Sequence, residues 1–293
     1  MNAYPRLIAA MITPFKDDER VDYEGAQQLA LKLLDCGNEG LVVSGTTGES
    51  PTLSKQEKLD LFKAIKDAVG EKGWVFAGTG SNSTIESARL TAEASKLGVD
   101  GIMAVTPYYN KPNQEGLFQH FKTVAGATDL PVILYNVPGR TGVNMLPETV
   151  ARLAGIPNIT ALKEACGNMD QVSALMTMIP DNFLIYSGDD SMTLPIMAVG
   201  GYGVISVASH VAGKMMNKMI YSYLKGWIEE AGQIHRRLFP LYKAMFVTTN
   251  PIPVKKAVSL LGLPAGKPRL PLVEATPEET RVIKKAMENL ELI

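Results

Sequence analysis

The chain has 293 residues, 46% of them hydrophobic, and its 29 basic and 30 acidic residues leave a formal net charge of −1. Because the sequence has no basic block and no apolar run of about 18–20 residues, we expect neither nucleic acid nor a membrane as a partner. The two cysteines, Cys36 and Cys166, lie far apart and favour a cytoplasmic protein over a disulfide framework. Pro14 interrupts the first apolar run, and we expect no signal peptide.

Eight short apolar runs, rich in Val and Ile, recur with amphipathic segments between them. Runs that are apolar throughout are typical of strands buried on both faces. The predicted strands span residues 7–12, 40–45, 74–80, 101–107, 132–138, 159–164, 183–189 and 203–209. The predicted helices span residues 23–36, 54–69, 83–97, 115–125, 147–154, 169–178, 192–199 and 214–228. Ser54 and Glu57 have the spacing of a capping box.

This alternation predicts an α/β fold, a (β/α)8 TIM barrel over residues 1–228. An open, doubly wound sheet is the competing interpretation, because alternation does not prove closure. Residues 229–293 predict a C-terminal helical extension packed on the barrel, with helices at 229–246, 253–261 and 277–290. In such barrels the chemistry lies in the loops that follow the strands, so the residues after each apolar run are the candidates.

The loop after the second predicted strand, VSGTTGES at residues 43–50, is rich in small and hydroxylated residues. A solvent-facing turn needs fewer such residues. A loop that presents hydroxyls and backbone N–H groups to an anion has this composition. The residues by themselves leave both interpretations open.

Lys163 ends the predicted sixth strand, and strand alternation that places it inward also places Ala161 inward. Desolvation lowers the pKa of a buried lysine, and the neutral amine can form a Schiff base with a carbonyl. Tyr135 lies at the rim of the neighbouring fifth strand, where a phenol can accept and donate one proton. The ordinary alternatives are a surface lysine and a core tyrosine.

The sequence lacks the motifs of metal sites, of serine hydrolases and of dinucleotide-binding sites. The histidines, His120, His210 and His235, lie in unrelated βα units without a metal-binding spacing, so we expect no metal. The G-x-S-x-G elbow is absent, and no G-x-G-x-x-G follows the first strand, so we expect no nucleotide cofactor. Asp189 and Asp190 are interpreted as a turn and a helix start.

Six motifs occur in an order that resembles the dihydrodipicolinate synthase family. They are GTTGES (45–50), TPYYNKPNQEG (106–116), YNVPGRTG (135–142), LKEA (162–165), SGDD (187–190) and GVISV (203–207), and NPIPVKKAV (250–258) extends the resemblance into the helical extension. The resemblance implies a lyase of lysine biosynthesis that condenses pyruvate with L-aspartate semialdehyde. The dihydrodipicolinate synthase family belongs to a superfamily that also includes N-acetylneuraminate lyase and 2-keto-3-deoxy sugar acid aldolases.

The resemblance also assigns roles. Lys163 would form the Schiff base, Tyr135 would shuttle protons through Thr46 to Tyr109, and Thr46 and Thr47 would hold the carboxylate of pyruvate. Further substrate-binding positions are Arg140, Gly188 and Ile205. Arg140 resembles the residue that holds the carboxylate of the semialdehyde, and it distinguishes the synthases from the sialic acid lyases. Its ordinary alternative is a solvated loop arginine.

Three alternatives to the synthase function stay open: a sugar acid aldolase, a sialic acid lyase and a keto-acid-binding regulatory barrel. The resemblance implies a homo-oligomer, because it places Tyr109 across a subunit interface. The minimum unit would be a dimer, and the full assembly a tetramer built as a dimer of dimers. It also implies positions for lysine inhibition at Ser50, Pro51, Lys55, Lys58, Asn82, Glu86 and Tyr108. Lys55 and Lys58 depart from the inhibited pattern, so we expect weak or absent inhibition.

Overall fold

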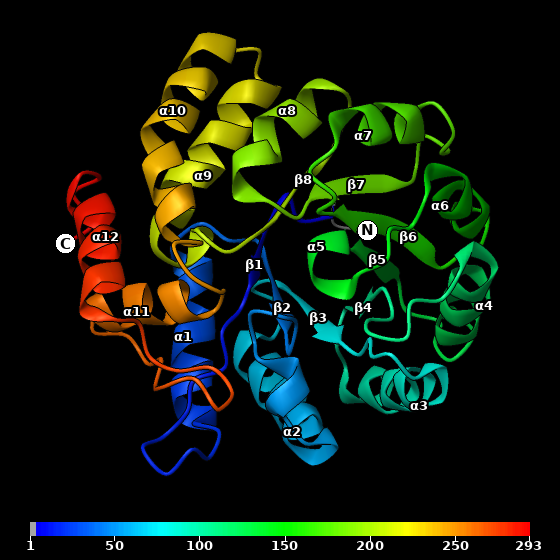
Figure 1. The fold of residues 1–293 in the computed structure, drawn as a ribbon, viewed down its shortest axis with the longest axis horizontal. Helices are drawn as coiled ribbons and strands as arrows, with labels where there is room; N and C mark the ends of the chain where they lie inside the picture. The colour runs from blue at the N-terminus through cyan, green and yellow to red at the C-terminus, as the bar shows by residue number, and fades with distance from the viewer. Residues whose placement is uncertain (1–3) are drawn as a thin grey trace. The chain divides into compact units, whose positions relative to one another are not determined.

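The computed structural model describes residues 4–293. Eight parallel strands follow one another in chain order and close into a barrel, as labelled in Figure 1. The predicted (β/α)8 fold is therefore confirmed, and the open-sheet alternative is wrong. The strands are β1 Leu7–Ala10, β2 Gly40–Val43, β3 Trp74–Gly78, β4 Gly101–Val105, β5 Val132–Asn136, β6 Ile159–Glu164, β7 Leu184–Ser187 and β8 Gly203–Ser206.

Most strands end earlier than the apolar runs that predicted them. After β1, for example, Met11 and Ile12 are as buried as the strand itself. Apolar character reports burial, and burial continues into the first residues of the loops, where strand pairing has already ended. The boundary error thus comes from core residues that lie outside the sheet.

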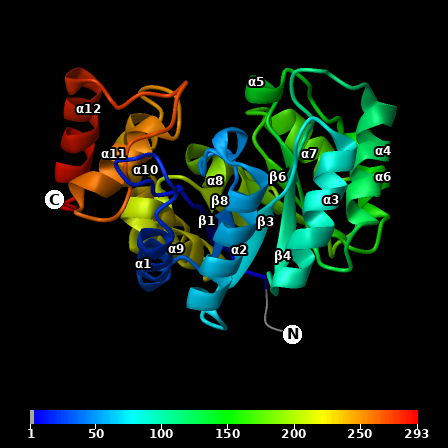
Figure 2. The same ribbon diagram turned by 90° about the horizontal axis from the view of Figure 1, so that it is seen from below.

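The chain forms two compact units, Met1–Val75 with Ser206–Ile293, and Phe76–Ile205. The first unit holds the C-terminal helices, where α10 packs against α9 and α12 contacts both α10 and α11 (Figures 1 and 2). Its helices are α1 Tyr23–Asp35, η1 Ser50–Thr52, α2 Lys55–Val69, α9 Ser209–Leu224, α10 Ile228–Ala244, α11 Ile252–Leu260 and α12 Pro277–Glu288. The division of the chain at residue 229 into a barrel and a helical extension packed on it stays a prediction.

Capping residues explain the start of α2 and the end of α9. Ser54 and Glu57 form the predicted capping box of α2, with the Ser54 N–H donating to Glu57 Oε2 over 2.8 Å. The prediction for α9 was displaced along the chain. This helix begins at the buried Ser209, which periodicity alone did not reveal, and it ends before Gly226, which adopts a left-handed φ of 81°.

The second unit contains neighbouring helices on the outside of its strands, and α4 contacts both α3 and α6 (Figure 2). Its helices are α3 Thr84–Ala94, η2 Ser95–Leu97, α4 Gln114–Ala125, α5 Pro138–Thr141, α6 Pro147–Ala154, α7 Met169–Met176, η3 Asp190–Met192 and α8 Thr193–Ala198. The short helix α5 was not predicted. Pro138 begins it and Gly142, with φ of 73°, ends it. Among the helices of residues 4–293, none is both long and apolar enough to span a membrane.

Candidate active site

Lys163 lies near the carboxyl end of β6, with a side chain that is buried at 4% exposure. The register of β5 and β6 pairs it with Tyr135, and its Nζ lies 4.3 Å from the centre of the Tyr135 ring. Burial lowers the pKa of Lys163 to about 8; the Asp190 carboxylate opposes this shift, and the Arg140 guanidinium adds to it. Compared with an exposed lysine, a larger fraction of this residue is a neutral amine at neutral pH.

Gly188, directly after β7, leaves space for the lysine side chain. A Cβ at this position would lie 3.2 Å from Lys163 Cγ and 2.8 Å from Ala165 Cβ. The Gly188 N–H donates to the carbonyl of Glu164 over 2.7 Å, which holds the end of β7 against β6. A larger residue would collide with Ala165 and crowd Lys163. Ile205, the other predicted substrate-binding residue of this region, is fully buried in β8.

A second pair of polar residues, Asn136 and Glu164, connects the ends of β5 and β6. Asn136 Nδ2 donates to both carboxylate oxygens of Glu164, over 3.0 and 3.2 Å, and the Cys166 N–H donates to Oε1 over 2.8 Å. Burial raises the pKa of Glu164, and these hydrogen bonds oppose the shift. Because side chains alternate along a strand, this pair faces away from Tyr135 and Lys163. The sequence analysis missed it, although polar residues next to both candidates were a signal.

Arg140 and Tyr109 lie in the segments that follow β5 and β4 in the second unit. Arg140 is exposed on α5, yet its charge acts on Lys163. Tyr109 is 89% exposed and has a left-handed φ of 74°. A bulky residue in this conformation is an outlier that motivates a functional hypothesis. Its N–H donates to the Thr141 carbonyl over 3.4 Å, which links the two segments.

The loop after β2, in the first unit, has a fixed and unusual backbone. Ser44 and Glu49 bracket it, and both adopt left-handed φ angles, 57° and 55°. Thr47 is buried, whereas Thr46 is half-buried. A Cβ at Gly48 would lie 3.0 Å from the carbonyl oxygen of Met11, so glycine is needed there. These features hold the hydroxyls and N–H groups of the loop in one arrangement.

A buried ion pair anchors this loop to the C-terminal helices. Lys255 Nζ donates to Glu49 Oε1 over 2.7 Å, and the two side chains are 2% and 1% exposed. Lys255 also donates to the carbonyls of Thr13 and Lys267, each over 3.1 Å. Burial lowers the pKa of Lys255, and the Glu49 carboxylate opposes that shift. The partners are 206 positions apart, so local sequence patterns gave no signal for the pair.

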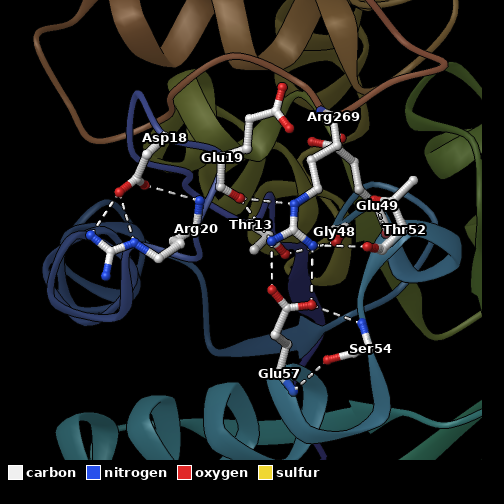
Figure 3. A network of polar contacts seen from close by, with 10 residues as sticks. All are labelled: Thr13, Asp18, Glu19, Arg20, Gly48, Glu49, Thr52, Ser54, Glu57 and Arg269. Carbon is white, nitrogen blue, oxygen red and sulfur yellow. Dashed lines mark hydrogen bonds and ion pairs between the residues drawn. The ribbon is translucent and has the colours of Figure 1, made fainter.

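Arg269 extends this network, as Figure 3 shows. Its N–H donates to Glu49 Oε2 over 2.9 Å, and its guanidinium pairs with Glu57 in the capping box of α2. This pairing lowers the pKa of Glu57 to about 2. The guanidinium also donates to the carbonyl of Thr52 over 2.8 Å and to that of Glu19. Arg269 was missed because it lies in a loop of the extension without a recognisable motif.

The predicted allosteric positions are placed separately in the two units. Lys55 is exposed and Lys58 is half-buried in the first turn of α2, after Ser50 in η1, and burial lowers the pKa of Lys58. In the second unit, the Asn82 carbonyl accepts from Asn110 Nδ2 over 2.8 Å, Glu86 pairs with Arg89 over 3.1 Å, and Tyr108 is half-buried. A role for these residues in inhibition stays a prediction.

Two of the histidines have structural partners. His120 Nδ1 and Thr84 Oγ1 lie 3.0 Å apart, and the Ile12 N–H donates to His210 Nε2 over 3.1 Å. Burial lowers the pKa of each histidine to about 4. Over residues 4–293, no three His, Cys, Asp or Glu side chains gather as metal ligands.

Comparisons with known proteins agree over nearly the whole chain. The model of the dihydrodipicolinate synthetase family matches residues 3–290. The 4-hydroxy-tetrahydrodipicolinate synthase of Moorella thermoacetica is 56% identical, over 98% of this chain and 99% of that protein. The crystal structure of the synthase from Cyanidioschyzon merolae with lysine bound has a TM-score of 0.97 and 46% identity, covering 99% of each chain. A Bacillus anthracis synthase has a TM-score of 0.96 and 44% identity, over 98% of this chain and 99% of its own.

Proposed function

Because the chain belongs to the dihydrodipicolinate synthetase family, we infer that it condenses pyruvate with L-aspartate 4-semialdehyde through a Schiff base on Lys163. The product is 4-hydroxy-tetrahydrodipicolinate, with loss of one water. The observation that carries the residue assignment is the buried Lys163 amine, with its pKa lowered to about 8, beside the ring of Tyr135. The neutral fraction of this amine increases as the pH rises through about 8, and only the neutral form attacks a carbonyl.

The reaction needs an amine and a proton carrier at the same place. The Lys163 nitrogen attacks the ketone carbon of pyruvate, and loss of water from the adduct leaves the Schiff base. Removal of a methyl proton gives an enamine, which attacks the aldehyde carbon of the semialdehyde. The amino group of the second substrate then attacks the imine carbon and displaces Lys163. Tyr135 carries protons in these steps because one phenol oxygen can both donate and accept, with Thr46 and Tyr109 as its relay.

The loop after β2 binds the carboxylate of pyruvate through Thr46 and Thr47. The left-handed residues at its ends, Ser44 and Glu49, fix the backbone before substrate arrives. Hydrogen bonds from hydroxyl and backbone donors to an anion are stronger than those to a neutral group. A loop that is already ordered loses little conformational entropy when it binds the anion. Gly188 and Ile205 are assigned to pyruvate binding as well.

A substrate comparison tests the proposed reaction. Purified protein is incubated with pyruvate and L-aspartate 4-semialdehyde. In separate assays of cleavage, it is incubated without pyruvate with 2-keto-3-deoxy sugar acids or with N-acetylneuraminate. Turnover of the semialdehyde at a much higher kcat/KM than any sugar acid supports the proposal. Preferential cleavage of a sugar acid would replace it with the aldolase function, and binding of pyruvate without any turnover would leave the regulatory barrel.

Arg140 is assigned to the carboxylate of the semialdehyde. Replacing it with Ala should lower kcat/KM for the semialdehyde by about 30- to 1,000-fold, since a charge-assisted contact that the bound substrate shields from water is worth roughly 2–4 kcal/mol. Pyruvate binding should change far less. Steady-state kinetics with each substrate varied in turn measure this difference. Arg152→Ala, at an exposed arginine of α6, is the matched control. Equal kinetics in the two variants would make Arg140 an ordinary loop residue.

Tyr109 motivates a proposal about assembly. The residue is 89% exposed, unlike a core tyrosine, and its backbone has a left-handed φ. We expect a dimer as the minimum active unit, and a dimer of dimers as the full assembly, because a two-fold contact lets each subunit supply Tyr109 to its partner. Analytical ultracentrifugation together with an activity assay at the same concentrations checks this. A monomer with full activity would refute it.

Weak inhibition by L-lysine is the expectation from α2. Lys58 is half-buried, and repulsion between its ammonium group and a bound lysine is on the order of 1 kcal/mol, close to tenfold in affinity. Lys55, on the same turn, adds a second positive charge. Initial rates at increasing lysine concentration measure the inhibition. Half-inhibition below about 1 mM, which corresponds to about −4.1 kcal/mol of binding, would contradict the expectation of weak inhibition.

A further inference from the structure

We propose that Asn250 is a positioning residue that directs the hydroxyl proton of Thr47 toward the carboxylate of bound pyruvate. The inference rests on the proposed function, because it takes Thr47 as a ligand of that carboxylate. Asn250 Nδ2 donates to Thr47 Oγ1 over 2.9 Å, although the two residues are 203 positions apart. Both are buried, at 4% and 3% exposure. Asn250 stands just before α11, so the contact joins the C-terminal helices to the loop after β2.

The direction of this hydrogen bond determines what the hydroxyl offers to an anion. A threonine hydroxyl has one proton and two lone pairs. When the Asn250 amide donates to Thr47 Oγ1, it occupies a lone pair and leaves the hydroxyl proton for another acceptor. If the hydroxyl instead donated to residue 250, its lone pairs would face the carboxylate and repel it. An amide donor at position 250 therefore suits an anion-binding threonine.

Neighbouring hydrogen bonds fix the position of Asn250 relative to the loop after β2. The Lys255 N–H donates to the Pro251 carbonyl over 2.9 Å at the start of α11, and Lys255 Nζ binds Glu49 at the far end of the loop. The Thr13 hydroxyl donates to the Gly48 carbonyl over 2.7 Å between these two points. One short segment, residues 250–255, thus contacts the loop at Thr47 and at Glu49. Figure 3 shows Thr13, Gly48 and Glu49 of this arrangement.

Substitutions at Asn250 should change the affinity for pyruvate selectively. Asn250→Ala removes the donor and should raise KM for pyruvate about tenfold, the equivalent of one hydrogen bond to an anion. Asn250→Asp keeps the shape but accepts the Thr47 proton and adds a negative charge, so its KM for pyruvate should rise further. KM for the semialdehyde should stay within about twofold, a difference smaller than the loss of one hydrogen bond.

A matched control separates this effect from a general loss of packing. Asn38 is equally buried at 4% exposure, and its Nδ2 donates to the carbonyls of Leu33 and Ser209 over 2.9 and 3.3 Å. It lies before β2, at the opposite end of that strand from Thr47. Asn38→Ala should lower the thermal midpoint without changing KM for pyruvate. A pyruvate effect no larger in Asn250→Ala than in Asn38→Ala would overturn the proposal.

The decisive experiment is a double-mutant cycle with Thr47→Val, read as KM for pyruvate in steady-state assays. If Asn250 acts through the Thr47 hydroxyl, Asn250→Ala should have no further effect in the Thr47→Val background. A full, additive increase in KM would show that Asn250 acts independently of Thr47 and would contradict the proposal. Should the Ala variant fail to fold, Asn250→Leu, which has a similar size but neither a donor nor a charge, takes its place in the cycle. Wild-type protein that turns over no pyruvate would refute the proposed function itself, whereas active wild type with an additive cycle refutes only the role of Asn250.

Discussion

Replacing Lys163 with Met is expected to lower kcat/KM for both substrates by at least about 1,000-fold, because the variant has no amine to form the Schiff base. The other buried lysine cannot substitute for it. Lys255 donates to Glu49, Thr13 and Lys267, which uses all three protons of an ammonium group and leaves no nucleophilic lone pair. Steady-state assays of the purified variant, at enzyme concentrations high enough to detect residual turnover, measure the loss.

The same variant separates activity from stability. Burial disfavours the charged amine of Lys163 in the folded protein and lowers its pKa. Methionine has a similar length and no charge, so we expect the thermal midpoint of Lys163→Met to stay equal or rise. Lys163→Arg, which keeps a cation but cannot form a Schiff base, should be equally inactive. Substantial activity in either folded variant would show that another residue is the nucleophile.

Replacing Lys255 with Met is expected to destabilise the protein by about 3–5 kcal/mol, because Glu49 would keep its buried carboxylate without the ammonium partner. Glu49 retains the hydrogen bond from the Arg269 N–H, but one donor does not replace a cation at 2.7 Å. Urea unfolding at a fixed protein concentration measures the change, since the stability of an oligomer depends on concentration.

Two further variants serve as controls for the loss of stability in Lys255→Met. Lys63→Ala, which breaks the exposed pair between Lys63 and Asp67, should change the free energy of unfolding by less than about 1 kcal/mol. The double variant Lys255→Met with Glu49→Gln removes both charges and should recover part of the loss, because no unpaired charge stays buried. If Lys255→Met matched the exposed control, the buried pair would contribute little to stability.

The barrel and the main strand-end residues could be predicted because their signals are local. Eight apolar runs mark eight strands, and adjacent parallel strands of similar length end together, so Tyr135 and Lys163 fall side by side. The role of Lys163 follows from one physical conflict, a lysine in an interior strand. The capping box of α2 was equally local, since Ser54 and Glu57 bond to each other.

Residues that act through distant partners could not be predicted in this way. Lys255 and Asn250 contact the loop after β2 from more than 200 positions away, and in the sequence they resemble surface residues of a helical extension. Asp190 was correctly placed at a helix start, but its burial and its effect on the pKa of Lys163 depend on how β6 and β7 pack. Fold-level contacts, rather than local patterns, determine these roles.

The central claim is that Lys163 carries pyruvate as a Schiff base, and borohydride trapping tests it most directly. Protein is mixed with pyruvate, reduced with borohydride, digested and mapped by mass spectrometry. We expect one stable pyruvate adduct, on the peptide that contains Lys163, and none in the Lys163→Met variant. An adduct at full yield in that variant, or one mapped to a different lysine in the wild-type protein, would contradict the account.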